Sequence, residues 1–162
     1  MAKKRGKSLF SLSTLLASFF GAAMIALAFA YFNYKFSEYK FINFDEWTFY
    51  EKSDVFIPKS DKYIVVFYSS KEKDTMTHLA QIDLNMPILA IDYYNQVRDN
   101  TPSTTFLRSG TKTSLSFIQR FNIYESPSIF FIKKHKDNLY KQDSMIRKLD
   151  NLNELSKAIN NL

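Results

Sequence analysis

The sequence predicts a mixed α/β domain that follows a single membrane-spanning helix. Its 162 residues suit one domain with an appendage. An uncharged, mostly apolar run fills residues 8–33, and strand-like runs alternate with helical periodicity after residue 62. We therefore expect a basic stub and transmembrane anchor over residues 1–33, an aromatic-rich juxtamembrane segment over 34–61, and the folded domain over 62–162.

The first segment has the composition of a membrane anchor. About 24 largely apolar residues are enough to cross a hydrocarbon core of roughly 30 Å. The basic residues precede this run and mark the cytoplasmic side: Lys3, Lys4, Arg5 and Lys7. The expected location is the inner (cytoplasmic) membrane, with a single span, a cytoplasmic amino terminus and a periplasmic or extracellular domain.

A cleavable signal peptide is the competing interpretation of this segment. Ala28-Phe29-Ala30 has the small-x-small pattern that precedes a cleavage site. The apolar run is longer than the usual signal core of about 7–15 residues, and aromatic residues follow it. A retained anchor is therefore favoured, and both interpretations place the domain outside the cytoplasm.

A row of small residues recurs every four positions along the anchor: Thr14, Ser18, Ala22, Ala26 and Ala30. Small residues at this spacing allow a second helix to approach closely. Alanine and serine are also common in membrane helices, so a chance row is an equally good explanation. The row is a candidate transmembrane helix interface.

The net charge of +6 is mainly a topology signal. Residues 1–32 hold four basic and no acidic residues, whereas the remainder holds 18 basic and 16 acidic residues. This distribution argues against a nucleic-acid partner. The chain has no cysteine, so an exported domain would fold without disulfides.

The elements of the domain follow in order. The continuous apolar run at residues 64–68 predicts a central strand, and residues 69–74 form a charged turn. Helical spacing over residues 76–80 predicts a helix, which Pro87 brings to an end. Residues 88–91 predict a second buried strand.

The second half of the domain begins with a polar stretch. Residues 95–114 predict a surface loop, and Ser114 is placed to cap a short helix that carries apolar residues up to Phe121. Residues 128–132 predict a third strand, and residues 139–143 its hairpin partner. A capping-box pattern predicts a closing helix over the last 12 residues. The order is a β-α-β opening and a β-β-α ending.

This order resembles that of the thioredoxin fold. The stretch "VVFYSSKEKDT" resembles the family's first core strand and active-site turn, with Glu72 and Thr75 at the two cysteine positions. The stretch "RFNIYESPSIFFI" resembles the segment around the family's cis-proline, with Pro127 in that place and Ser126 before it. The resemblance implies a thioredoxin-like domain over residues 62–162 and a cis bond between Ser126 and Pro127.

A narrower resemblance is to the TraF-type conjugative pilus-assembly family. The stretch "EWTFYEK" resembles a motif that precedes the domain in that family, and "FYSS" matches the start of its turn. A long polar insertion before the proline segment also agrees, and several members lack one or both cysteines. The retained anchor departs from typical members, which are exported and soluble.

Little in the sequence indicates catalysis. Thiol–disulfide exchange needs a thiolate, and the chain has none. Glu72 is most simply part of a solvated turn. His78 and His135 lie 57 residues apart without further ligands, so no metal or cofactor is expected. The lysines of "KKHKDN", residues 133–138, are most simply a solvated hairpin tip.

The resulting hypothesis is a non-catalytic, membrane-anchored binding or assembly component of an envelope-spanning conjugation or secretion apparatus. In redox thioredoxins the cis-proline loop and the active-site turn form a groove for an extended polypeptide. The corresponding candidate groove consists of Ser70, Glu72, Thr75, Ser126 and Pro127. The expected partners are the membrane and other membrane or periplasmic proteins, with no small-molecule substrate. The alternative is a membrane-tethered chaperone or holdase for exported proteins.

Overall fold

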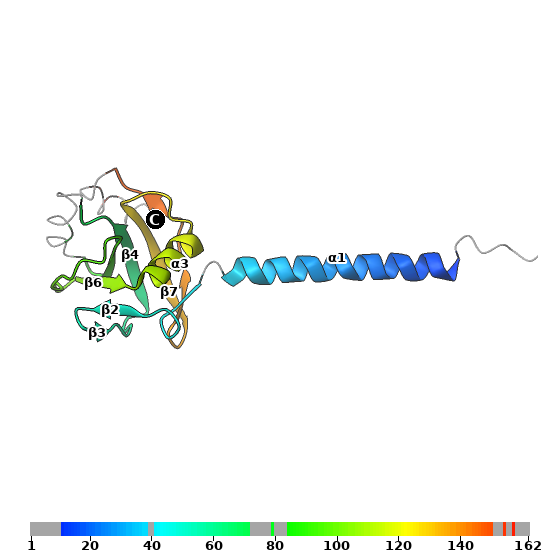
Figure 1. The fold of residues 1–162 in the computed structure, drawn as a ribbon, viewed down its shortest axis with the longest axis horizontal. Coiled ribbons are helices and arrows are strands. Elements are labelled where there is room, and N and C mark those ends of the chain that lie inside the picture. The colour runs from blue at the N-terminus through cyan, green and yellow to red at the C-terminus, as the bar shows by residue number, and fades with distance from the viewer. Residues whose placement is uncertain are drawn as a thin grey trace, which may run out of the picture. The chain divides into compact units, whose positions relative to one another are not determined.

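The computed structural model describes residues 11–38, 41–71, 79, 84–150, 154 and 157, with only the backbone described for residues 35–38. The chain divides into two compact units, Met1–Glu38 and Tyr39–Leu162. Figure 1 shows a long helix in the first unit and a strongly bent sheet in the second. The predicted mixed α/β class with an amino-terminal apolar helix is confirmed.

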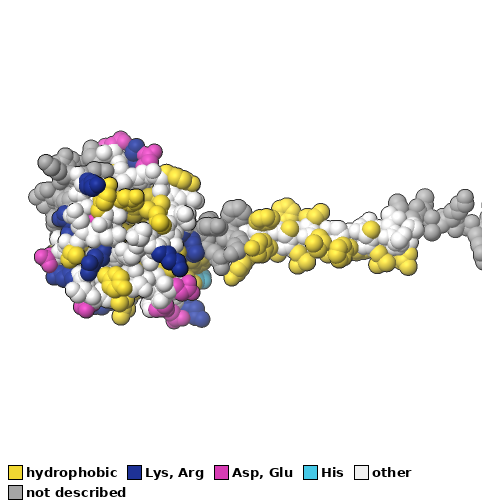
Figure 2. Space-filling model, in the orientation of Figure 1, with side chains coloured by type: hydrophobic (Ala, Val, Ile, Leu, Met, Phe, Trp, Pro, Cys, Tyr) yellow, Lys and Arg dark blue, Asp and Glu magenta, His cyan; other side chains and the backbone are white. Residues whose placement is uncertain are grey.

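The first unit is helix α1, Leu12–Glu38. Its 23 residues from Leu12 to Tyr34 are long and apolar enough to cross a membrane, although a signal sequence would have the same properties. Ser11 caps the helix, since its hydroxyl accepts the N–H of Thr14 at 3.2 Å. Figure 2 shows apolar side chains along the length of α1. A helix that is apolar on all sides needs an apolar environment.

The centre of the second unit is a four-strand group that follows the predicted order. β4, Lys62–Tyr68, pairs in parallel with β5, Ile88–Asp92. On its other side β4 pairs antiparallel with β7, Ser128–Lys136, which forms a hairpin with β8, Leu139–Gln142. The predicted strands at 64–68, 88–91, 128–132 and 139–143 are therefore present. β4 and β5 are buried on both faces, which explains their continuous apolar runs.

The prediction of a surface loop over residues 95–114 is wrong in part. β6, Thr104–Ser109, lies in this region and pairs in parallel with β5. Phe106 and Leu107 are its only large apolar residues, because threonine, arginine and serine occupy the other positions. Because this composition is polar, the sequence holds no signal for a strand here. The strand is stabilised by its backbone pairing with β5.

The start of the following helix also differs from the prediction. α3 spans Thr111–Phe121, and Gly110 rather than Ser114 is its N-cap. Ser114 is buried inside the helix, and its hydroxyl lies 2.8 Å from the hydroxyl of Ser109. The serine thus joins α3 to β6 and does not cap the helix.

Residues 41–55 extend both edges of the sheet. β1, Phe41–Asn43, pairs with β8 at one edge. β2, Phe49–Glu51, pairs with β6, and β3, Asp54–Val55, pairs with β2 at the other edge. The segment 34–61, predicted as juxtamembrane, is thus divided between α1 and this sheet. A further strand, β9, Arg147–Lys148, pairs with β7.

The sheet curls into a half-barrel, and aromatic residues join its two edges. The ring centroid of Phe44, which follows β1, lies 5.4 Å from that of Tyr140 on β8. The same ring lies 5.9 Å from Phe49 of β2 and 5.5 Å from Phe56, which follows β3. One phenylalanine therefore contacts strands from opposite ends of the strand order.

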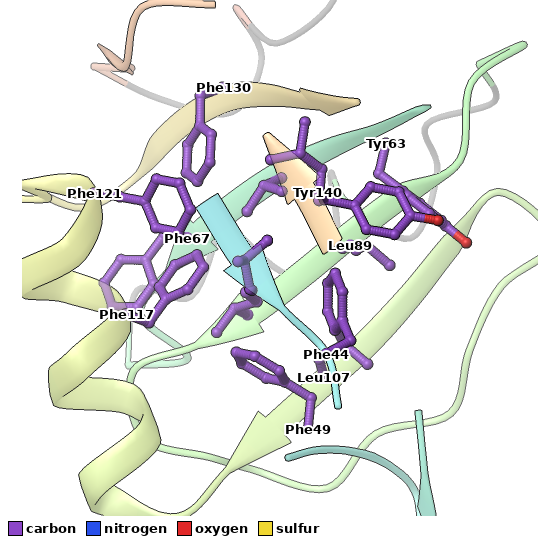
Figure 3. Close-up of a cluster of buried hydrophobic side chains, with 14 of the residues drawn as sticks. Phe44, Phe49, Tyr63, Phe67, Leu89, Leu107, Phe117, Phe121, Phe130 and Tyr140 are labelled. Carbon is purple, nitrogen blue, oxygen red and sulfur yellow. The ribbon is translucent and has the colours of Figure 1, made fainter. Parts of the chain in front are cut away.

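The main core lies between α3 and the face of the sheet that it covers (Figure 3). Phe117 and Phe121 point from α3 towards the strands, and their rings lie 6.1 and 4.9 Å from that of Phe130. The opposite face of the sheet carries a second apolar cluster, which includes Leu79 and Leu149. The predicted helices that begin near residues 76 and 151 lie outside the described residues, apart from isolated positions.

Candidate functional site

The candidate site is a cleft where β4 and β5 end and β7 begins. A cavity of about 260 Å³ opens there. Such a place, beyond the carboxyl ends of neighbouring parallel strands, is where open α/β sheets commonly bind ligands. Its lining comes from the ends of β4 and α3 and from the segments after β5 and before β7: Phe67, Ser69, Tyr93, Tyr94, Ile118, Ile123, Tyr124, Glu125 and Ser126.

Three tyrosines give the cleft its aromatic character. Tyr93 and Tyr94 follow β5, and their rings meet edge to face at 5.0 Å. Tyr124 is 87% exposed. The ammonium of Lys71 lies 4.1 Å from the ring centroid of Tyr94, within the range of a cation–π contact. Exposed aromatic rings beside a cavity supply large contact areas with little conformational freedom to lose.

Asp92 holds two walls of the cleft together. Its carboxylate is buried at the end of β5 and accepts the backbone N–H of Ser70 at 2.9 Å. It also accepts the N–H groups of Tyr94 at 3.2 Å and Gln96 at 2.8 Å. Since Ser70 follows β4 and the other two follow β5, one side chain fixes both segments. Burial and the nearby Asp92 carboxylate raise the pKa of Tyr68.

The third wall is the loop before β7. The Ser126–Pro127 peptide bond is cis, which confirms the prediction. The carbonyl of Pro127 accepts the N–H of Leu149 at 2.9 Å, and the hydroxyl of Ser128 donates to the carbonyl of Glu125 at 2.5 Å. Glu125 also forms an ion pair with Lys148, and this contact raises the pKa of the lysine. The loop is thus held to β7 and to the segment around β9.

The structure brings together part of the predicted groove. Ser126 lines the cavity, Pro127 follows it in the same loop, and Ser70 is tied to the opposite wall through Asp92. The buried hydroxyls of Ser70 and Ser126 have no hydrogen-bond partner among the residues that the structure describes. Buried polar groups normally have partners, and of these two serines only Ser126 lines the cavity. Glu72 and Thr75 lie outside the described residues.

The three tyrosines were missing from the predicted groove. The sequence holds a signal for each of them. Tyr93 and Tyr94 directly follow a buried strand, where a continuous apolar run gives way to "DYYNQ". Tyr124 lies three positions before Pro127. Aromatic residues just outside strand ends, beside a proline loop, are the pattern that would have identified them.

A second cavity, of about 330 Å³, lies between β2 and the start of α3. Its polar groups already serve the fold. The Arg108 guanidinium donates to the carbonyl of Lys52 at 2.6 Å, and the N–H of Ser109 donates to Asn95 Oδ1 at 2.7 Å. These bonds fasten loops to β6, so this cavity offers less to a ligand than the cleft does.

The predicted row on α1 lies on a described part of the helix. All of its members are exposed. At about 100° per residue, each step of four advances the row by about 40° around the helix. Only neighbours such as Ala22 and Ala26 therefore share one face. The hydroxyl of Ser18 already donates to the carbonyl of Thr14 at 2.9 Å and needs no partner from another helix.

The cleft gathers aromatic and polar groups of several kinds. Its lining includes tyrosine rings, Ser69, Ser126 and Glu125, and the Lys71 ammonium lies beside it against the ring of Tyr94. Within the described ranges, no three histidine, aspartate or glutamate side chains gather as metal ligands would. No protein-family model matches the sequence, and a search of curated proteins finds no similar chain.

Proposed function

We propose that the protein is a non-catalytic, membrane-anchored, thioredoxin-like component that holds an extended segment of a partner protein in the cleft. In this proposal α1 is a retained anchor, and the partner belongs to an envelope-spanning conjugation or secretion apparatus. The narrower part of the proposal, a TraF-like role, rests on the sequence motifs described above. The observation that carries the binding role is the tyrosine-lined cleft beside Pro127.

The strand arrangement supports the thioredoxin-like part of the proposal. β4 and β5 form the parallel pair that a β-α-β opening requires, and β7 and β8 form the hairpin of a β-β-α ending. The loop with Pro127 and the turn after β4 flank one cleft, as the resemblance implies. In this proposal β1, β2, β3 and β6 are additions that enlarge the sheet.

The dimensions of the cleft suit side chains of a bound polypeptide. Its volume of about 260 Å³ lies below the roughly 300–1,000 Å³ of typical small-molecule pockets. A cavity of this size suits one or two side chains of a longer segment. The segment's backbone would meet the polar groups at the rim, while its apolar side chains would contact the tyrosines. Extended segments are commonly bound in this way.

A holdase remains the second candidate, because an aromatic surface also suits transient capture of many exported proteins. A photo-crosslinking amino acid placed at Tyr124 separates the two. Ile57, which is 62% exposed and follows β3, provides a matched control position. Full-length protein is expressed in its native host, irradiated and purified in mild detergent. The crosslinked peptide is then identified by mass spectrometry.

The proposal predicts one dominant crosslinked protein at position 124, absent at position 57. A synthetic peptide of the crosslinked segment should bind the full-length protein. The Tyr94→Ala and Tyr124→Ala variants should each weaken this binding by about tenfold, since one aromatic contact contributes about 1.4 kcal/mol. Ile57→Ala should leave it unchanged. Many unrelated crosslinked proteins would favour the holdase, and a peptide that binds the tyrosine variants normally would refute the cleft as the site.

A further inference from the structure

Three lysines lie directly opposite one another across three neighbouring strands. Lys62 of β4 is opposite Lys133 of β7, and Lys133 is opposite Lys141 of β8. Phe41 of β1 continues the row, because it is opposite Lys141. We call these four residues the lysine row. Residues that are directly opposite project from the same face of a sheet, so the four side chains share a face.

The face is the one that α3 leaves uncovered. The neighbours of the row in sequence, Tyr63, Ile132 and Tyr140, belong to the core cluster under α3. Because side chains alternate along strands, the lysines project to the other side. All three lysines are exposed. The stretch "KKHKDN" predicted a solvated hairpin tip that includes Lys133, but the register places this lysine in the middle of a charged row.

The row concentrates positive charge that the described residues scarcely neutralise. Neighbouring strands are about 4.8 Å apart, and like charges directly opposite each other destabilise a sheet. Lys62 has one acidic neighbour, Asp143, at 3.8 Å with both side chains about half exposed. Lys133 and Lys141 have no acidic partner among the described residues. An external anion would relieve this repulsion.

An aromatic residue completes the row. Phe41 is half-buried, with the ammonium of Lys141 at 5.9 Å and the ring of His135 at 5.2 Å from its ring centroid. Lysines beside an aromatic ring are typical of surfaces at the membrane–water interface, where the ammonium groups meet headgroups and the ring meets apolar chains. The composition of the row therefore suits a lipid surface.

We propose that the lysine row binds the headgroups of anionic phospholipids in the membrane that α1 enters. In the chain only residues 39 and 40 separate α1 from β1. Three peptide units span at most about 11 Å, so covalent connectivity keeps Phe41 near the end of α1. The inference rests on the retained anchor of the proposed function and is independent of the cleft.

The test uses full-length protein in vesicles. The chain has no cysteine, so a single introduced cysteine carries a fluorophore without background labelling. His135→Cys places the label beside the row, and Asp54→Cys places it on β3, at the other end of the strand order. Quenching by headgroup-spin-labelled lipid is measured in phosphatidylcholine vesicles and in vesicles with one third phosphatidylglycerol. The row variant is Lys62→Gln/Lys133→Gln/Lys141→Gln.

We expect the label at position 135 to be quenched more strongly in anionic vesicles than in phosphatidylcholine vesicles. High salt should abolish this difference. Each lysine near an anionic surface contributes about fivefold to the attraction. The row variant should therefore shift the contact equilibrium by on the order of 100-fold, whereas a control variant of other exposed lysines, Lys52→Gln/Lys59→Gln/Lys112→Gln, should not.

Equal quenching in the two vesicle types would overturn the proposal, since connectivity alone would then explain proximity. An unchanged signal in the row variant would overturn it as well. If anionic lipid increased the quenching of the labels at positions 135 and 54 equally, the whole domain would be attracted to the vesicle. This result would also count against binding by the lysine row. Crosslinking from Tyr124 is unaffected by these outcomes, so the cleft and the row can fail separately.

Discussion

Replacement of Asp92 by alanine should destabilise the domain and loosen the cleft. The carboxylate accepts three backbone N–H groups, from Ser70, Tyr94 and Gln96. At roughly 1 kcal/mol for each hydrogen bond, the loss is about 3 kcal/mol of unfolding free energy. This is a large part of the roughly 5–15 kcal/mol that stabilises a typical domain.

Asp92→Asn should lose less unfolding free energy than Asp92→Ala, so the two variants can be compared in one assay. The asparagine carbonyl can still accept the N–H groups of Ser70 and Tyr94, which both use Oδ1. Its amide group then faces the N–H of Gln96, where two donors cannot pair. The expected loss is about 1–2 kcal/mol, between the wild type and the alanine variant.

Urea unfolding of the full-length protein in detergent micelles measures these losses. The chain has one tryptophan, Trp47, whose ring lies 6.3 Å from that of Phe117, so its fluorescence reports on the core. Amide hydrogen exchange at Ser70 and Gln96 should accelerate in the alanine variant. The exposed Asp54→Ala is the control, with an expected change within about 0.5 kcal/mol. A loss below 1 kcal/mol for Asp92→Ala, or equal losses for Asn and Ala, would refute this account of the carboxylate.

Burial raises the pKa of Tyr140 to about 12, above the usual value of about 10. Its contribution to stability is therefore complete below about pH 10 and is lost as the pH rises through about 12. Tyr140→Phe loses the 2.6 Å hydrogen bond to the Ser60 carbonyl and should be less stable than wild type near neutral pH. Between about pH 10 and pH 12 it should lose less stability than wild type in urea unfolding, and equal declines would contradict this. Phe44→Ala should cost about 3–5 kcal/mol in the same assay, because this ring joins both edges of the curled sheet, and a loss near 1 kcal/mol would mean that the edges do not depend on it. Ala22→Leu/Ala26→Leu should leave membrane insertion intact while reducing co-purification of partners at matched membrane levels; unchanged co-purification would make the small-residue row a chance pattern.

The central strands were predictable because they are buried on both faces. Residues 64–68 and 88–91 are short continuous apolar runs, and such runs are typical of strands buried on both faces. The cis bond before Pro127 was predictable from a local motif. α1 was predictable because an apolar run of its length is rare in other contexts.

β6 and the strands of residues 41–55 were not predictable in the same way. β6 has only two large apolar residues, and β1, β2 and β3 have two or three residues each. Such short or polar segments gain their stability from the neighbouring strand and from aromatic contacts across the curl. That energy depends on which segments lie side by side, which is a property of the tertiary structure.

The sequence by itself determined which residues favour an apolar environment, and hence the long apolar helix α1, the central strands and the loop with Pro127. Only the tertiary structure decided which side chains those elements bring together on the surface. Tyr94 and Tyr124 come together in one cleft because two loops meet at the same end of the sheet. Lys62, Lys133 and Lys141 form a row because the pairing register places them opposite one another. The periodicity of a sequence reports how each segment is buried but carries no record of register between distant strands, and register is what assembles both surfaces.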